Sequence, residues 1–418
     1  MKLQPLIETL IGTEPPIAVR AYDGSVVGPA DAPATLVVNS PDALRRMITS
    51  PGELGMARAY VAGDIDIEGD IYAVIRMRDR LPPLSAQLRF AAQATRLLGV
   101  RNLRPLEPPE QEARLRGRRH SKARDAAAVS HHYDVGNEFY RLFLGPSMTY
   151  SCALFENPRD GLEAAQARKY ELICQKLGLR PGMRLLDVGC GWGGMAIHAA
   201  RHHGVSAVGV TLSAEQAEAG QKLVADNGLT GQVEIRLQDY RDVTDGPYDA
   251  ISSIGMFEHV GLSKLQEYFR RLVSLLGSDA RLLNHAISRP RTTKPRLERN
   301  SFINRYVFPD GELHEVGTVI SALQNAGAEA RHMESLRPHY ALTLRHWVAN
   351  LESNWSEALD LVGAARARVW RLYMAGSAVN FETNRTQVHQ VLATRTIAGS
   401  RPHALPLRPD WSPAPPVP

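Results

Sequence analysis

A run of four glycines carries the clearest chemical signal in the sequence. It spans residues 189–194, directly after a short apolar run at 183–188 that reads as a buried strand, and it precedes a helix-like segment. Glycine allows positive φ and close backbone approach, so a ligand can lie against main-chain N–H groups at the N-terminus of the helix. The pattern predicts a strand, a tight turn and a helix start that together bind a ligand.

The glycine spacing first suggests a dinucleotide site, because Gly189, Gly191 and Gly194 satisfy the pattern G-x-G-x-x-G. A nicotinamide dinucleotide also needs an acidic residue about 20 positions further on to hold its ribose. Residues 208–213 occupy that place and contain no carboxylate. Asp187 instead stands just before the glycines, where it can fix the loop or contact a ligand with a cationic amino-acid tail. S-adenosylmethionine (SAM) has such a tail, and a structural turn that binds nothing is the alternative.

The composition is that of an ordinary soluble protein. The chain has 418 residues, of which 44% are hydrophobic and 22% charged, and it is long enough for two domains. We find no uninterrupted apolar run of about 18 residues that could span a bilayer. Pro5, Glu8 and Glu14 interrupt the apolar N-terminal stretch, which argues against a secretory signal. We therefore expect a cytoplasmic protein.

Neither the cysteines nor the adjacent histidines predict a metal site. Cys152, Cys174 and Cys190 show no C-x-x-C spacing and form no even set, which argues against disulfides and structural zinc. His131 and His132 point in different directions on a helix and lack a nearby carboxylate triad, so capping and core packing are the favoured roles. We expect no metal ion, and a reducing compartment.

Basic residues form two clusters within a modest net charge of +5, at 114–124 and 289–296. Each cluster alone is explained by a solvated linker or loop. Together they suit an anionic lipid surface or a nucleic acid. Residues 1–104 contain no basic platform with interleaved aromatic side chains, so we expect no nucleic-acid partner.

Proline and charge patterns divide the chain into four parts. Residues 1–104 read as a small α+β domain without a catalytic constellation, and 105–129 as a basic linker that begins in a proline-rich stretch. Residues 130–399 form the expected catalytic domain. The proline-rich tail at 400–418 is predicted to be disordered.

Strands and helices alternate through the catalytic domain, which predicts an α/β fold with a parallel, doubly wound, Rossmann-like sheet. The expected strands are 183–188, 206–211, 232–237, 248–254, 280–287 and a closing strand at 388–395, and the expected helices include 194–203, 214–227, 264–276 and 313–326. A ligand binds beyond the carboxyl ends of such strands. Those ends hold Asp187 with the glycines, 211–216, 238–240, 257–259 and His285.

Six motifs in order along this domain resemble those of the cyclopropane-fatty-acyl-phospholipid synthases. Their relatives include the mycolic acid methyltransferases and the actinobacterial enzymes that start 10-methyl (tuberculostearic) fatty acid synthesis. The motifs are SHHYDV at 130–135, MTYSC at 148–152, LDVGCGWG at 186–193, GVTLS at 209–213, FEHVG at 257–261 and YALTLRHW at 340–347. The resemblance covers roughly residues 120–400, and the N-terminal domain is similar to that of the longer, phospholipid-acting members.

In this family the methyl group of SAM adds to a cis double bond of an acyl chain, and bicarbonate takes a proton from the resulting cation. The resemblance implies that SAM lies against Tyr150, Ser151, Gly189, Gly191, Thr211, Leu212, Ser213, Gln216, Asp239 and Tyr240, with Asp187 beside them. It implies that bicarbonate is surrounded by Cys152, Glu258, His285 and Tyr340. Aromatic faces can stabilise the cation, and the candidates are Tyr133, Phe139, Tyr140 and Tyr306.

These residue types suit the chemistry. An isolated alkene is a poor nucleophile, so the sulfonium methyl and the double bond must be held in line in a dry pocket. The anion needs hydrogen-bond donors, which His285 and Tyr340 could supply, while Glu258 could accept from its hydroxyl or orient His285. Each group has a plainer alternative, since Cys152 could be a small buried residue, His285 a core histidine and Tyr340 part of helix packing.

Two products are open to the cation. It can close to a cyclopropane ring, or shift a hydride and lose a proton to leave a methylene branch. The N-terminal domain, the basic linker and the high content of arginine and proline favour the 10-methylene product.

We expect the substrate to be a membrane phospholipid with an unsaturated acyl chain. We expect the protein to contact the inner face of the cell membrane through the basic clusters and to form a homodimer. A methylene product would also require a reductase partner. The alternatives are an RNA or small-molecule methyltransferase and a non-catalytic lipid- or SAM-binding protein.

Overall fold

The computed structural model describes residues 2–80, 84–99, 103–113, 124, 135–291, 301–309, 311–395 and 405–411. The chain forms two compact units, each assembled from separate segments. Unit 1 comprises Met1–Arg114, Glu298–Pro309 and Leu351–Val379, and unit 2 comprises Leu115–Leu297, Asp310–Asn350 and Asn380–Pro418. No helix within the described residues is long and apolar enough to cross a membrane.

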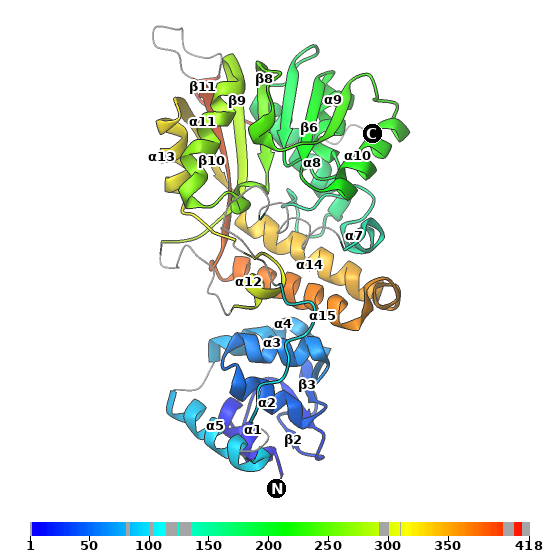
Figure 1. Cartoon of the computed structure of the whole chain (residues 1–418), viewed down its shortest axis with the longest axis vertical. Coiled ribbons are helices and arrows are strands. Elements are labelled where there is room, and N and C mark those ends of the chain that lie inside the picture. Colours follow the sequence, from blue (N-terminus) through cyan, green and yellow to red (C-terminus); the bar gives the residue numbers. More distant parts are fainter. Residues whose placement is uncertain are drawn as a thin grey trace. The chain divides into compact units, whose positions relative to one another are not determined.

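Unit 1 combines a four-stranded sheet of order β2-β1-β3-β4 with helices (Figure 1). The strands are β1 (Ala18–Ala21), β2 (Val26–Val27), β3 (Ala34–Val38) and β4 (Ile65–Gly69). The helices are α1 (Gln4–Ile11), α2 (Pro41–Thr49), α3 (Glu53–Ala62), α4 (Ile71–Arg76), α5 (Leu84–Leu98), α12 (Phe302–Tyr306) and most of α15 (Trp355–Glu382). Only the pair β1–β3 is parallel, because β2 and β4 each run antiparallel to their neighbour.

Long-range packing enlarges unit 1 beyond the predicted 1–104 domain. The middle of α15 belongs to unit 1, where Arg368 pairs with Asp66 at 2.9 Å and Arg371 donates to the hydroxyl of Tyr60 at 3.1 Å. This helix lies within residues 130–399, which were predicted to form the catalytic domain. The periodicity of the residues in α15 predicts a helix, but it does not show which of the two units the helix packs in.

Unit 2 contains a seven-stranded sheet of order β10-β11-β9-β8-β5-β6-β7 (Figure 1). The strands are β5 (Arg184–Val188), β6 (Ser206–Thr211), β7 (Val233–Leu237), β8 (Tyr248–Ile254), β9 (Leu276–Ser288), β10 (Ala328–Ser335) and β11 (Gln387–Arg395). Strands β5 to β9 are parallel, whereas β11 runs antiparallel to both β9 and β10. The predicted Rossmann-like α/β fold is therefore confirmed, and the strand bounds differ from the expected ones by a few residues.

Both faces of this sheet are buried, as expected for parallel strands covered by helices. Successive residues alternate between two cores, so that Leu185 packs on one face and Leu186 on the other, and Leu283 and Leu282 do the same. Helices on one face are α8 (Leu162–Leu177), α9 (Gly194–His203) and α10 (Ala214–Asp226), and those on the other are α11 (Leu265–Leu275) and α13 (Val316–Asn325). Two further helices are α7 (Asn137–Leu144) and α14 (Arg337–Ser353), and short 3-10 turns lie at Tyr240–Asp242 (η3) and Phe257–His259 (η4).

Residues 405–411 of the tail that was predicted to be disordered are described by the structure and pack against the core of unit 2, whereas 400–404 and 412–418 lie outside the described residues. Leu405 and Trp411 pack against the core that contains α8 and α9. The ring of Trp411 also lies edge-on to His332 of β10, with 4.6 Å between centroids. These two apolar side chains place residues 405–411 against the core, which the proline content alone did not indicate.

Candidate active site

The glycine loop after β5 requires glycine at two positions for different reasons. Gly189 adopts φ +74°, and a Cβ there would lie 2.8 Å from the side chain of Met256. A Cβ on Gly194 would lie 2.5 Å from the hydroxyl of Tyr170. Gly189 is required because its backbone is left-handed, and Gly194 is required because the Tyr170 side chain packs directly against it. With no side chains at these positions, the main chain of the loop can lie directly beside the cavity.

A cavity of about 1200 Å³, including its open mouth, lies beyond the carboxyl ends of β5, β6 and β8. Of the residues predicted to bind SAM, those that line it are Tyr150, Ser151, Asp187, Gly189, Gly191, Thr211, Leu212, Gln216 and Tyr240. The position agrees with the rule that ligands of such sheets bind at the strand ends.

Ser213 and Asp239 do not line the cavity, although we expected them to. The Ser213 hydroxyl accepts from the backbone N–H of Gln216 at 3.2 Å and caps α10. The Asp239 carboxylate accepts two bonds from the guanidinium of Arg241, at 2.8 and 2.6 Å, and caps η3. Both side chains support the loops that border the cavity, and Arg241 lines the cavity in place of Asp239.

Lys169 is a cavity residue that the motifs did not indicate. It is 0% exposed, and its Nζ donates to the Ser151 hydroxyl at 3.0 Å. Burial lowers the pKa of Lys169 to about 7, while the nearby Cys152 and Asp187 favour its charged form. Its only sequence signal is a lysine on the face of α8 that also holds the buried Ala165 and Ile173.

Asp187 supplies the opposite charge on the same cavity. Its Oδ1 accepts from the Ser252 hydroxyl at 2.7 Å, and burial raises the pKa of Asp187 to about 6, against the lowering influence of Ser252 and Lys169. A buried ammonium and a buried carboxylate facing one cavity suit a zwitterionic ligand such as the amino-acid end of SAM.

Aromatic rings continue from the cavity toward α14. Tyr140 lies 5.0 Å from Trp192 and 5.6 Å from Tyr150 between ring centroids, and Tyr150 stacks on Trp347 at 5.2 Å. The predicted aromatic candidates Phe139 and Tyr140 are both buried in this group. Tyr306 belongs to unit 1, and Tyr133 lies outside the described residues.

Glu258 and His285 lie next to the cavity but do not line it. The Oε1 of Glu258 accepts from the backbone N–H of Ile287 at 2.6 Å, while its Oε2 is buried without a hydrogen-bond partner among the described residues. Burial raises the pKa of Glu258 to about 7. His285 pairs across the sheet with Ile254, which does line the cavity.

A chain of hydrogen bonds fixes the tautomer of His285. Buried Lys176 donates to Gln390 Oε1 at 2.7 Å and also pairs with Glu334, so the amide nitrogen of Gln390 faces His285 Nδ1 at 3.1 Å. Nδ1 therefore accepts, and the proton of the neutral ring is on Nε2. Burial, with Lys169 and Lys176 nearby, lowers the pKa of His285 well below its usual value. Its Nε2 is a buried donor without a partner in the described part of the chain.

Cys152 and Tyr340 meet at the start of α14. The Cys152 thiol lies 3.7 Å from the carbonyl oxygen of Leu336, which also accepts from the backbone N–H of Tyr340 at 3.1 Å. Burial raises the pKa of the Cys152 thiol far above its usual range, which favours the thiol over the nucleophilic thiolate. The buried Tyr340 ring packs edge-on to Trp347 at 6.0 Å.

Sheet order, glycine loop and charged cavity together define a SAM-dependent methyltransferase. The mycolic acid cyclopropane synthetase family model matches residues 120–391, and the chain belongs to this family, whose members are SAM-dependent fatty acid methyltransferases. The family predicted from the six sequence motifs is therefore confirmed.

Three curated relatives extend over both units. The chain is 46% identical to a probable fatty acid methyltransferase of Mycobacterium tuberculosis, with 99% of each chain covered. It is 34% identical to a cyclopropane-fatty-acyl-phospholipid synthase of Escherichia coli, covering 88% of this chain and 89% of that one. It is 33% identical to a tuberculostearic acid methyltransferase of Mycobacterium tuberculosis, with 90% and 87% covered.

Among solved structures, a mycolic acid cyclopropane synthase complexed with S-adenosylhomocysteine (SAH) and CTAB matches 65% of this chain and 98% of its own. The TM-score is 0.61 at 36% identity. SAH is the product that SAM leaves after methyl transfer, and this neighbour supports SAM as the methyl donor here.

Proposed function

We propose that this protein transfers the SAM methyl group to a cis double bond in an acyl chain of a membrane phospholipid, through a carbocation, and forms a 10-methylene branch. The observation that carries the proposal is a pair of buried polar atoms beside the cavity, Glu258 Oε2 and His285 Nε2, that have no hydrogen-bond partner among the residues that the structure describes. One accepts and the other donates, so together they suit a small anion that carries a hydroxyl.

The cavity residues would hold SAM by charge and by main-chain contact. Asp187 would pair with its ammonium group and Lys169 with its carboxylate, while the glycine loop lies against its main body. The predicted contacts of Tyr150, Ser151, Gly189, Gly191, Thr211, Leu212, Gln216 and Tyr240 are retained in this proposal. Ser213 and Asp239 support the neighbouring loops instead.

The alkene carbon forms a bond to the methyl carbon as the carbon–sulfur bond breaks, which leaves SAH and a cation on the acyl chain. The aromatic group around Tyr140, with Tyr133 as a further candidate, would stabilise this charge. A hydride shift and loss of a proton from the added carbon then give the methylene branch. Bicarbonate, when bound between Glu258, His285, Cys152 and Tyr340, would supply a weakly nucleophilic base for that proton.

The residues present fit such an anion. His285 Nε2–H would donate to it, Glu258 Oε2 would accept from its hydroxyl, and Tyr340 would be a second donor. Cys152 would shape the site through its backbone and small buried side chain. A neutral His285 suits this role, because a neutral N–H donor orients an anionic base without transferring a proton to it.

Two relatives bear on substrate and product. One is named for phospholipid and a cyclopropane product, and one for tuberculostearic acid, and both match this chain over both units. A cyclopropane ring is therefore the second candidate product. A phospholipid substrate implies contact with the inner membrane surface, for which the two basic clusters are the candidates. In the second cluster, Arg289 forms an ion pair with Glu315 at 3.1 Å. Of the first cluster, only Arg124 lies within the described residues. A homodimer and a reductase partner remain part of the proposal.

Incubating the protein with SAM and vesicles of cis-monounsaturated phospholipid tests the proposal. We expect a mass gain of one CH₂ per modified chain, and oxidative cleavage at the new branch. A chain that gains CH₂ but resists cleavage would contain a cyclopropane. No gain in vesicles, with a gain on free acyl thioesters, would contradict a phospholipid substrate, and no gain on either by a SAM-binding preparation would contradict acyl methylation.

Replacement of Lys169 by methionine should weaken binding of SAH by about tenfold or more, because the buried ammonium is lost while the hydrophobic stem is kept. Since the pKa of Lys169 is about 7, the ratio between wild-type and variant affinities should shrink as pH rises above about 7. Calorimetric titration measures both effects. Lys222→Met, at an exposed residue of α10, is the matched control, and equal affinities of Lys169→Met and wild type would contradict the assignment.

A further inference from the structure

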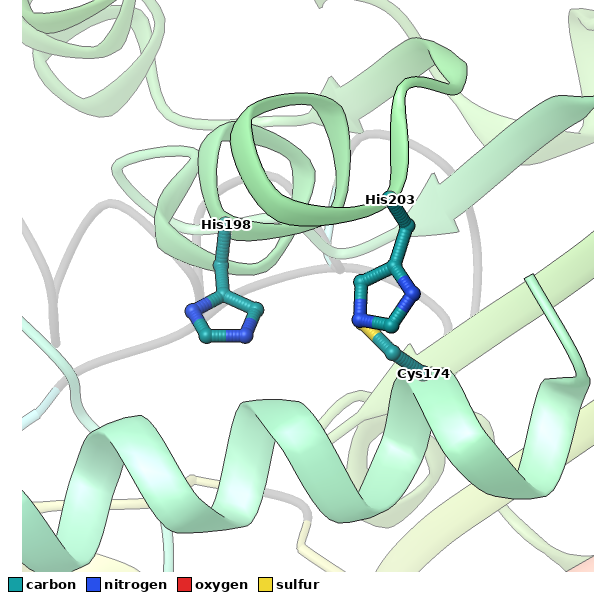
Figure 2. A group of neighbouring side chains, drawn as sticks. All are labelled: Cys174, His198 and His203. Atoms are coloured by element: carbon teal, nitrogen blue, oxygen red, sulfur yellow. The ribbon is translucent and has the colours of Figure 1, made fainter. Parts of the chain in front are cut away.

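Three metal-ligand side chains converge on the side of the sheet that α8 and α9 cover (Figure 2). Cys174 projects from α8, and His198 and His203 project from α9 toward it. One ligand atom of each lies within 4.8 Å of the other two. None of the three belongs to the cavity or to the residues assigned to catalysis.

Helix geometry explains the convergence. Glu171 and Cys174 are three residues apart on α8 and therefore share a face, and α8 packs against α9. The Oε2 of Glu171 lies 3.4 Å from His198 Nε2 and 3.0 Å from His203 Nε2. The carboxylate of Glu171 therefore lies within hydrogen-bonding distance of both imidazoles, and the Cys174 thiol lies near the same two rings.

We propose that Cys174, His198 and His203 bind one divalent cation of borderline softness, such as Zn²⁺. Glu171 would complete a four-coordinate site or orient the two imidazoles. A cysteine with two histidines is a donor set that zinc accepts, at bond lengths of about 2.0–2.3 Å, so two ligand atoms of one tetrahedral ion lie roughly 3.3–3.6 Å apart. Binding would therefore require side-chain rotations that bring the ligand atoms closer together than the 4.8 Å within which they now lie.

The burial of the ligands suits a bound ion. Cys174 is 0% exposed, whereas the side chains of His198 and His203 are 14% and 19% exposed. The thiol is therefore shielded, and an ion can enter from the histidine side. The absence of C-x-x-C spacing among the cysteines argued against structural zinc. The proposed site uses one cysteine, and His198 and His203 become neighbours of Cys174 because α8 packs against α9.

The exposed neighbour His202 offers a competing arrangement. His198 and His202 are four residues apart on α9, with 4.5 Å between ring centroids, and such a pair can bind a metal at the helix surface without any thiol. The two arrangements differ in their need for Cys174. This difference decides the experiment.

Titration of the full chain, without a histidine tag, with Co²⁺ as a spectroscopic probe tests the site. We expect one Co²⁺ per chain, tetrahedral d–d absorption, and a sulfur-to-cobalt charge-transfer band that reports the thiolate. Zn²⁺ should displace the Co²⁺ and raise the unfolding temperature. Cys174→Ala should abolish the charge-transfer band, and His203→Gln should weaken binding at least tenfold.

His202→Gln is the matched control and should leave the spectrum unchanged. Co²⁺ that binds without a charge-transfer band, or that is lost in His202→Gln but kept in Cys174→Ala, would overturn the proposal, as would the absence of saturable binding. These readouts need neither SAM nor lipid, so they stand apart from the test of methyl transfer.

Discussion

Glu258→Gln should lower turnover by about 100- to 10,000-fold while SAH still binds. The amide oxygen of glutamine can keep the bond from the Ile287 N–H, but its NH₂ group replaces the buried acceptor Oε2 with a donor. The site then loses the atom that we propose accepts a hydrogen bond from the anion's hydroxyl. Turnover with phospholipid vesicles and calorimetric SAH binding measure the two effects.

The pH dependence separates this loss from unfolding. Burial raises the pKa of Glu258 to about 7, so wild-type activity should fall as pH drops below about 7 and the acceptor is protonated. A raised pKa stabilises the folded state at low pH, and that contribution is lost as pH rises through about 7. Glu258→Gln should therefore gain thermal stability relative to wild type between about pH 5 and pH 8. Glu267→Gln, at an exposed residue of α11, is the control, and near wild-type turnover of Glu258→Gln would contradict the assignment.

Gln390→Met should lower kcat by about 10- to 100-fold with little change in SAH affinity. Gln390 touches neither the cavity nor the atoms assigned to the reaction, so it acts by positioning His285. Without its amide, Nδ1 loses its donor and the ring is free to place its proton on either nitrogen. Lys176 keeps its pairing with Glu334, so the variant should fold.

The tautomer itself is the decisive measurement. Nitrogen NMR of labelled histidine should show His285 protonated on Nε2 in the wild type and as a mixture in Gln390→Met. Gln387→Met, at the start of the same strand, removes only a bond to Asn384 and should change neither spectrum nor turnover. A wild-type ring protonated on Nδ1, or full turnover in Gln390→Met, would contradict this role.

The sequence predicted those parts of the site that follow parallel strands. Asp187 and Thr211 could be expected at one edge because they lie within the last two residues of β5 and β6, and Glu258 because it follows β8 within four residues. The carboxyl ends of parallel strands share that edge. Lys169 could not be placed, because a lysine inside a helix is usually exposed and its burial depends on the sheet beneath α8. Gln390 lies opposite His285 only because β11 runs antiparallel to β9 in one register. That register results from long-range pairing, which no local motif reports.

The extent of unit 1 could not be predicted from the sequence for a similar reason, because its segments are joined by long-range contacts. Helix α15 is interrupted at Gly363, where φ is +74°, and the segment that follows contacts strand and helix residues near position 60 through Arg368 and Arg371. Local periodicity marks these residues as helical, but their partners lie about 300 positions earlier in the chain.

The strand order of unit 2 differs from the order in which its strands are translated. Strand β11 is the last to leave the ribosome, yet it lies between β9 and β10. Strand β10 therefore has its neighbour in the sheet only once the end of the chain is translated. The Gln390 amide that faces His285 Nδ1 is on β11, so a polypeptide halted before residue 387 would lack the contact that we propose positions His285.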